Sequence, residues 1–234
     1  MRRLCTIIAC CVLTVAMLVF VLFNAPAQAE WYVAGQGGAT YSGFFDPLGI
    51  STGPAAGTRF SQLGLQSSPL YGGKIGYYLD EEGWQWLGFE MEAYSSTQHV
   101  KQQGVEIIGP GGTSDSVQLT TGKDVRVTTW APISMMVRIP IGALEPYVGV
   151  GFGVSFLHIH DATTDTTANS NMNTGLIGKA GLRWRMTKHL ALFGEWKYHE
   201  FDFNFDKVPI GSVSGGGEGT YRTHIAVGGL GWHF

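Results

Sequence analysis

The chain has 234 residues, of which 34 are glycine and 14% are charged, and its formal net charge is −3. A composition rich in glycine and in aromatic residues is typical of many short strands joined by turns, and it argues against a helical bundle. The weak negative charge and the lack of a basic tract argue against a nucleic-acid-binding protein.

The first 29 residues are predicted to be a secretory signal peptide. Arg2 and Arg3 precede the uncharged apolar run 7–23, and Ala27–Gln28–Ala29 forms an A-x-A cleavage site. A retained membrane anchor is the alternative, because the run approaches the ~20 apolar residues that a spanning helix needs. Cleavage after Ala29 leaves residues 30–234 as one domain. All three cysteines lie in the leader, so this domain has no thiol for a disulfide or a metal site.

From residue 30 onward, apolar residues recur at every second position, which is the period of a β-strand. In one clear example Val148, Val150 and Phe152 alternate with glycines. The same pattern occurs eight times, and each repeat has room for the roughly 9–11 residues of a tilted transmembrane strand. The predicted strands are 30–43, 70–79, 85–98, 124–141, 145–159, 174–186, 189–204 and 219–234.

The lengths of the connections alternate along the chain. The connections after the second, fourth and sixth strands are short, namely 80–84, 142–144 and 187–188. Those after the odd-numbered strands are long and mostly polar, namely 44–69, 99–123, 160–173 and 205–218. Bacterial outer-membrane barrels have short periplasmic turns and longer extracellular loops. We therefore predict an all-β fold, an eight-stranded antiparallel up-and-down transmembrane β-barrel. Pro132 would interrupt the fourth strand and predicts a bulge, whereas Pro140 would lie at the rim.

One face of these strands carries charges at mid-strand. A soluble barrel would turn this face outward and would have to hold Trp184, Trp196 and other bulky groups inside, where eight strands leave little space. In a bilayer the apolar face meets lipid and the charges fill the lumen. The predicted lumen charge network consists of Lys74, Glu90, Glu92, Arg138, Lys179, Arg183, Glu195 and Lys197.

Aromatic residues fall towards the ends of the predicted strands, where interfacial girdles occur in membrane barrels. Ordinary β-propensity is the alternative explanation for any one of them. The residues of the predicted girdles are Trp31, Tyr32, Tyr77, Tyr78, Trp84, Trp86, Trp184, Tyr198 and Trp232.

Three segments resemble small outer-membrane barrels of the OmpA, OmpX and opacity-protein type. The first has the P…PY-V-G-x-G-x-G pattern, and the second is the F-x-E-W-K-Y segment 193–198. The third, GGLGWHF, is similar to the C-terminal assembly signal of these barrels through Gly229, Trp232 and Phe234, although Val227 stands where a polar residue is usual. The first pattern comprises Pro140, Pro146, Tyr147, Gly149, Gly151 and Gly153. The resemblance implies the outer membrane of a Gram-negative bacterium, with outer-membrane lipids, lipopolysaccharide and the barrel-assembly machinery as partners.

Three functions fit such a barrel. The favoured one is a structural or surface-interaction role, with the lumen plugged by ion pairs and the long loops meeting an extracellular partner. A narrow channel for small or apolar solutes, as in OmpW-type barrels, is the alternative, since the glycines of 149–153 could leave space. A lipid A-modifying enzyme is less favoured, because no histidine has the His-x-Ser spacing of barrel deacylases.

We expect no enzymatic activity, cofactor or metal site. His158, His160 and the pair His199 and Glu200 fall near the outer rim and could act as bases, although polar rim contacts are the commoner role. Two stretches, 161–171 and 202–206, contain aspartates without the ligand density and fixed glycine of a calcium loop, and we interpret both as solvated loops.

Overall fold

The computed structural model describes residues 30–53, 56–79, 84–112, 114–119, 123–161, 166–210 and 213–234. The predicted signal peptide and its cleavage site lie outside the described residues. No helix among the described residues is long and apolar enough to cross a membrane. The strands are β1 (Glu30–Ile50), β2 (Arg59–Phe60), β3 (Leu63–Gly64), β4 (Ser68–Tyr78), β5 (Leu87–His99), β6 (Gln103–Ile108), β7 (Ser114–Leu119), β8 (Lys123–Arg138), β9 (Leu144–Asp161), β10 (Thr166–Asn169), β11 (Asn173–Arg185), β12 (Leu190–Ile210) and β13 (Val213–His233).

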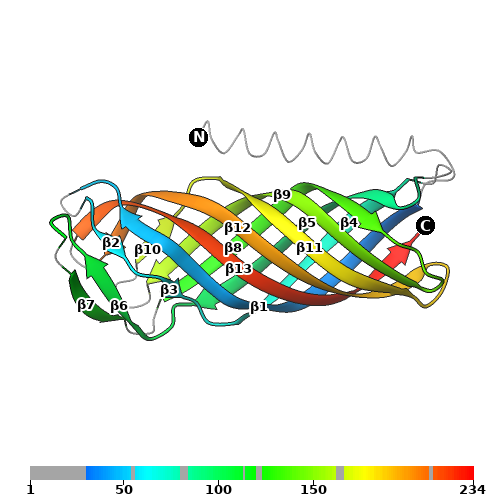
Figure 1. Cartoon of the computed structure of the whole chain (residues 1–234), viewed down its shortest axis with the longest axis horizontal. Helices are drawn as coiled ribbons and strands as arrows, with labels where there is room; N and C mark the ends of the chain where they lie inside the picture. Colours follow the sequence, from blue (N-terminus) through cyan, green and yellow to red (C-terminus); the bar gives the residue numbers. More distant parts are fainter. Residues whose placement is uncertain are drawn as a thin grey trace.

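Eight of these strands close into a ring (Figure 1). Their hydrogen-bonded order is β1–β4–β5–β8–β9–β11–β12–β13, and β13 pairs back with β1. Every pair in the ring is antiparallel. A sheet in hydrocarbon must close in this way, because water cannot satisfy a free edge there. The predicted eight-stranded antiparallel barrel is confirmed.

The turns between β8 and β9 and between β11 and β12 lie at one end of the barrel with both ends of the described chain, and β2, β6, β7 and β10 lie at the other (Figure 1). The turn between β8 and β9 is only a few residues long, and Gly142 adopts the left-handed conformation there with φ of 63°. Glycine favours such a turn because it has no Cβ to clash. Since short turns face the periplasm in bacterial barrels, we assign the other end to the cell exterior.

Pro132 lies at a bulge, as predicted. The register of β8 against β9 shifts between Trp130 and Ile133, and the register of β5 against β8 shifts between Glu90 and Glu92. A bulge accommodates proline, because the ladder is already interrupted where the amide hydrogen is missing. Pro140 follows the end of β8 and lies at the rim.

The expectation of long polar loops is only partly correct. The first strand continues to Ile50, and β12 and β13 extend as a paired hairpin far beyond the predicted boundaries at 204 and 219. The connection after β5 forms the hairpin β6–β7, and β2 joins this hairpin to β1. Asp202 was expected in a solvated loop, but it lies on β12. Proline and glycine residues interrupt the strand period of the sequence in these segments, as at Pro47, at Pro209 and at 215–217.

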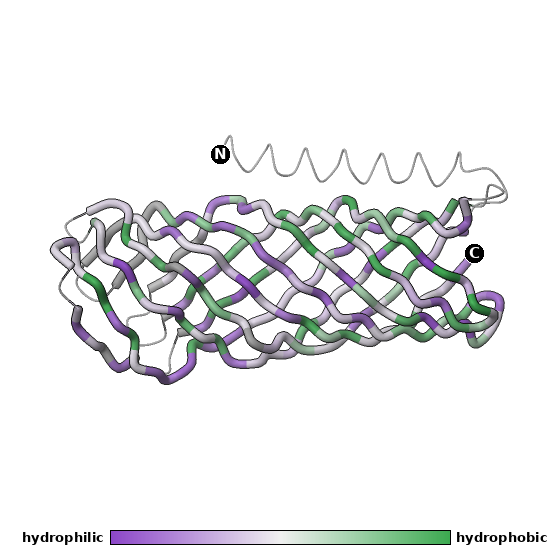
Figure 2. The backbone as a smooth tube through the Cα atoms, in the orientation of Figure 1, coloured by the Kyte–Doolittle hydropathy of each residue, from purple (hydrophilic) through white to green (hydrophobic). Residues whose placement is uncertain are grey.

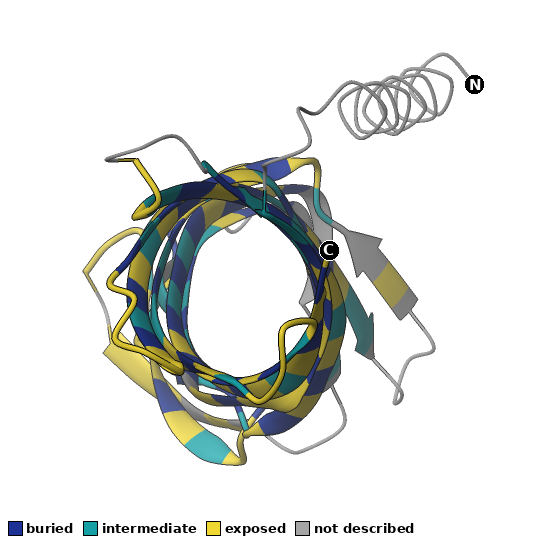
Figure 3. Ribbon diagram, turned by 90° about the vertical axis from the view of Figure 1, so that its right-hand side faces the viewer, coloured by how far each residue is buried: buried dark blue, intermediate teal, exposed yellow. Residues whose placement is uncertain are grey.

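Side chains alternate between the two faces along every strand of the ring, and the burial bands of Figure 3 follow this alternation. The hydropathy bands of Figure 2 alternate in the same way. On the outer face the bulky apolar residues are exposed to the surroundings, including Phe152 at 44%, Trp184 at 48% and Trp196 at 42%. At the level of this apolar belt the charged side chains lie inside. This arrangement is that of a membrane barrel and the opposite of a soluble one.

The predicted aromatic girdles need one correction. Trp84, Trp86, Trp184 and Trp232 lie on the outside as expected, with 42–52% of each exposed. Tyr32 and Tyr78 point into the lumen instead, and each is only 1% exposed. Adjacent residues of a strand point to opposite faces, so the pairs 31–32 and 77–78 cannot both face lipid.

Candidate functional site: the charged lumen

The structure places all eight residues of the predicted charge network inside the barrel. Their exposed fractions range from 0% for Lys197 to 6% for Arg138. They form two separate groups along the barrel axis. Six of them make a ring at mid-barrel, and the two arginines belong to a second cluster nearer the periplasmic end.

The mid-barrel ring is a closed cycle of three lysines and three glutamates. Lys74 Nζ lies 3.3 Å from Glu90 Oε2 and 2.9 Å from Glu195 Oε2. Lys179 Nζ lies 2.9 Å from Glu90 Oε1 and 2.7 Å from Glu92 Oε1. Lys197 contacts Glu92 and closes the cycle through Glu195 Oε1 at 3.2 Å. Each lysine therefore touches two glutamates, each glutamate touches two lysines, and the ring is neutral.

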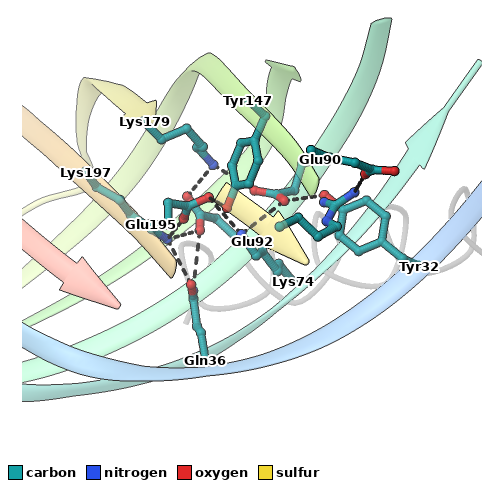
Figure 4. Close-up of polar contacts among 11 residues, drawn as sticks. Tyr32, Gln36, Lys74, Glu90, Glu92, Tyr147, Lys179, Glu195 and Lys197 are labelled. Carbon is teal, nitrogen blue, oxygen red and sulfur yellow. Dashed lines mark hydrogen bonds and ion pairs between the residues drawn. The ribbon is translucent and has the colours of Figure 1, made fainter. Parts of the chain in front are cut away.

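The ring crosses the lumen (Figure 4). Lys74 is on β4 and its partner Glu195 is on β12, while Lys197 on β12 contacts Glu92 on β5. Three steps along the hydrogen-bonded order separate β4 from β12, and four steps, half of the ring, separate β5 from β12. The contacts of Lys179 on β11 with β5 cross in the same way. The side chains therefore bridge opposite walls.

Uncharged polar groups add hydrogen bonds to the ring, although Glu195 Oε1 accepts no hydrogen bond and has only its ion pair with Lys197. The hydroxyl of Tyr32 donates to Glu90, and that of Tyr147 donates to Glu195 Oε2 at 2.9 Å. Lys197 Nζ also donates to Gln36 Oε1 at 3.1 Å. A buried charge is tolerated when it is paired and hydrogen-bonded in this way.

Glycines make room for these tyrosine rings on the lumen wall. A Cβ placed on Gly76 would lie 2.3 Å from the ring of Tyr32, and one on Gly181 would lie 2.5 Å from the ring of Tyr147. Real Cβ atoms do not approach this closely. The glycines opposite bulky residues thus fit large side chains into a narrow lumen, and this packing accounts for part of the glycine content.

The second cluster lies towards the periplasmic end and is richer in arginine. Arg138 Nη1 is 2.7 Å from Glu30 Oε2, and Arg183 Nη1 is 3.5 Å from Glu145 Oε2. Arg185 contacts both of these glutamates. The guanidinium of Arg138 also lies 3.9 Å from the centre of the Tyr78 ring, which is a cation–π geometry.

Sequence reasoning missed seven residues that belong to these two groups, and the alternation of side chains along each strand could have placed them on the lumen face: Glu30, Tyr32, Gln36, Tyr78, Glu145, Tyr147 and Arg185. Glu145 lies two positions before Tyr147 on the lumen face, and Arg185 lies two positions after Arg183. Glu30, Tyr32 and Gln36 likewise share one face of β1. The amide and the tyrosines were missed because only charged residues were considered.

A histidine–serine contact lies in the lumen on the extracellular side of the ring. His199 Nε2 is 3.3 Å from Ser155 Oγ, and its Nδ1 is 3.1 Å from the hydroxyl of Tyr94. Ser155 is 0% exposed and His199 is 1% exposed. Glu200 faces outward, so the predicted pairing of His199 with Glu200 is wrong. His158 points outward, and His160 Nδ1 lies 3.4 Å from Thr167 Oγ1.

Above this level the lumen is filled by an apolar core. Phe201, Phe203 and Phe205 follow one another on the inner face of β12. They pack with residues of β1, β3, β6, β8, β9 and β13 and with two residues that lie between strands, Leu65 and Val100. The other buried members are Phe45, Leu63, Leu65, Val100, Val105, Val125, Val127, Leu157 and Tyr221.

The predicted assembly signal lies on and just after the last strand. Trp232 and Phe234 point outward and are 52% and 57% exposed. A Cβ on Gly229 would lie 2.6 Å from the ring of Phe193, so this glycine also has a packing role. Recognition of these residues by assembly machinery stays a prediction. Among the described residues, no three His, Cys, Asp or Glu side chains are grouped as metal ligands.

Comparisons with known proteins agree with this architecture. Residues 13–234 match the family described as outer membrane protein beta-barrel domain. The fold is similar to OprG from Pseudomonas aeruginosa (TM-score 0.58, 14% identity, 88% of this chain and 96% of that one). It is also similar to Neisserial surface protein A (TM-score 0.53, 13% identity, 88% and 99%). No curated protein matches the chain significantly by sequence. The chain belongs to the outer-membrane protein β-barrel family and is an integral protein of the bacterial outer membrane.

Proposed function

We propose that this protein is a closed barrel that acts at the cell surface through its extracellular strands, with a structural or interaction role. The observation that carries the proposal is the neutral ring of three lysines and three glutamates across the lumen. An eight-stranded barrel has an interior about as wide as its own side chains, so a ring that bridges opposite walls leaves little room for a solute path.

The apolar core above the ring supports the same role. Its side chains occupy the lumen where the strands extend beyond the outer apolar belt. A solute would have to pass both a fully paired ionic layer and a packed hydrocarbon layer. The buried contact between Ser155 and His199 lies between these two layers, so we propose no catalytic role for it.

The extracellular strands offer the surface for interaction. The hairpin β6–β7 and β2 continue the sheet beyond β1, and Ser114, Asp115, Ser116 and Gln118 on β7 are exposed. Within the described residues β7 pairs only with β6, so its second edge is open to another chain. An exposed edge of this kind is suited to adding a strand from a partner.

Conductance in planar bilayers tests the closure. We expect the refolded protein to give no repeated openings. A variant with both layers weakened, Glu92→Ala with Lys197→Ala and Phe203→Ala, shows whether the assay detects an opened lumen. Repeated unitary openings of the unmodified protein, with an ion selectivity altered by Lys197→Gln, would contradict the proposal and favour the narrow-channel alternative.

Cysteine labelling tests the surface assignment, because residues 30–234 contain no cysteine. We expect a membrane-impermeant maleimide to label Ser116→Cys on intact cells. The matched control, Ala143→Cys in the β8–β9 turn, should react only after the outer membrane is permeabilised. The reverse pattern would place β6–β7 in the periplasm and remove the surface role.

A further inference from the structure

Two arginines face outward just beyond the apolar belt, on different sides of the barrel. Arg222 on β13 is neutralised, since its Nε lies 3.1 Å from Glu200 Oε2 and its Nη1 lies 4.0 Å from Asp46 Oδ2. Arg126 on β8 has a different setting. Its Nε donates to Thr97 Oγ1 at 3.4 Å, and its register partners on the two neighbouring strands are Thr97 and His158. Neither partner is an acid.

Histidines surround Arg126 on the outer face. His158 on β9 is its direct register partner, and the next level outward carries His99 on β5 and His160 on β9. Asp124 is the acid at this level, and its Oδ1 lies 2.6 Å from His99 Nδ1. We call His99, Arg126, His158 and His160 the histidine–arginine patch. On the side of Arg222, by contrast, Asp46, Glu200 and Asp202 make the same level acidic.

The patch lies directly above the bulky part of the apolar belt. Going towards the periplasm, the outward residues of β8 and β9 are Thr128 and Phe156 and then Trp130 and Val154. The wall continues with Val150 and Phe152, which are 60% and 44% exposed. Acyl chains of the outer leaflet lie against such a wall, and the headgroups of the same lipids then lie at the level of Arg126.

We infer that the histidine–arginine patch binds the phosphate of an outer-leaflet lipid headgroup of the lipid A class, with the acyl chains of that lipid on the β8–β9 wall. An arginine presents a planar fork of N–H donors that suits a phosphate, and imidazole N–H groups add further donors. The acidic level around Arg222 disfavours the same ligand on the opposite side. The inference does not depend on whether the lumen conducts.

Native mass spectrometry of the intact barrel in detergent, titrated with diphosphoryl lipid A, tests this site. We expect Arg126→Gln to weaken lipid A binding roughly tenfold, because charge-assisted hydrogen bonds to phosphate are lost. Arg126→Lys keeps the charge and should retain part of the affinity. Arg222→Gln is the matched control on the acidic side and should change the affinity by less than about twofold, as expected for an arginine already paired at the surface.

Two further binding measurements distinguish lipid A from a zwitterionic lipid and from free phosphate. Phosphatidylcholine should bind more weakly than lipid A and should respond little to Arg126→Gln. Inorganic phosphate should not displace the lipid. Equal losses in the two glutamine variants, equal binding of the zwitterionic lipid, or full displacement by inorganic phosphate would each overturn the inference. The heat-dependent shift in gel mobility shows that each variant is folded before it is compared.

Discussion

The strand β12 passes through two environments. Its inner face is polar and its outer face apolar at membrane level, and the reverse holds in the extracellular part. At membrane level Glu195 and Lys197 point inward while Trp196 points outward. Beyond Tyr198 the inner face carries Phe201, Phe203 and Phe205, and the outer face carries Glu200, Asp202 and Asn204. The backbone alternation continues without a break from one region to the other. Only the solvent outside changes, from lipid to water.

This exchange means that one barrel has two kinds of interior. In the membrane the outside is already apolar, so the inside can be polar if every charge is paired. In water the same sheet must hide its apolar side chains inside, as a soluble barrel does. The extracellular half of the barrel is therefore stabilised by an apolar core, whereas the interior of the membrane half is filled by ion pairs.

The largest expected effect comes from breaking the ionic interior. Lys197→Met should lower the free energy of unfolding by about 3–5 kcal/mol, because a buried partner charge is left uncompensated. The double variant with Glu92→Gln restores neutrality and should recover at least half of the loss. Urea unfolding of the refolded barrel in micelles, followed by tryptophan fluorescence, measures both. A double variant no better than the single one would contradict the ring as a charge-balanced unit.

Arginine substitutions on the outer face locate the boundary between the two environments. Val150→Arg places a charge against acyl chains and should cost about 2–4 kcal/mol in a bilayer. Asn204→Arg, on the outer face of the extracellular half, should cost about 0–0.5 kcal/mol, as for an ordinary surface change. Folding titrations in lipid vesicles compare the two. Similar costs at the two positions would mean that the belt extends further than the hydropathy pattern indicates.

The hydrophobic interior responds to the loss of methyl groups. Val125 is 1% exposed in the extracellular core, and Val125→Ala should cost about 1.5 kcal/mol, at roughly 0.8 kcal/mol per buried methylene. The effect should be local, with faster hydrogen exchange in the extracellular strands and unchanged exchange at the ring. Thr128→Ala, on the outer face of the same strand, is the control. Loss of exchange protection throughout the barrel would show that the two halves unfold as one unit.

The smallest effect concerns the outer face beyond the belt. The pKa of Glu200 is lowered from its ordinary 4.5 because Tyr198 and Arg222 donate hydrogen bonds to the carboxylate. The stabilisation from a lowered pKa is complete above about pH 4.5 and is lost as the pH falls through the lowered value. The pair is solvent-exposed, so we expect at most about 0.5 kcal/mol. The melting temperature should fall less between pH 6 and pH 3 in Glu200→Gln than in the unmodified protein. Identical pH profiles of the two proteins would show that this contact does not contribute to stability.

Much of the fold could be predicted from the sequence because two of its signals are local. The period-two pattern identified the eight ring strands, and the alternating connection lengths distinguished the two ends of the barrel. Pro132 indicated the bulge. The strand ends at 50, 210 and 213 were missed because proline and glycine interrupt the apolar alternation there, as at Pro47, at Pro209 and in the glycine run 215–217.

The candidate site could be predicted in part. The alternation of side chains along each strand placed the charged residues on one face, and closure of the sheet into a barrel made that face the interior. This alternation could not show that Lys74 contacts Glu195 or that Lys197 contacts Glu92, because these partners are 121 and 105 residues apart along the chain. The separation of Arg138 and Arg183 into a second cluster also depends on the stagger between strands.

Local patterns in the chain were sufficient to assign the class of this protein, because only a membrane barrel combines period-two alternation, alternating connection lengths and mid-strand charges. How the interior is filled depends on contacts between distant strands. Closure brings opposite walls within reach of a lysine side chain, and register selects which glutamate each lysine meets. The length of the strands relative to the bilayer decides where the interior changes from ionic to apolar. In lipid the outer face must be apolar and the inner face can hold paired charges, whereas in water the apolar face must be the inner one.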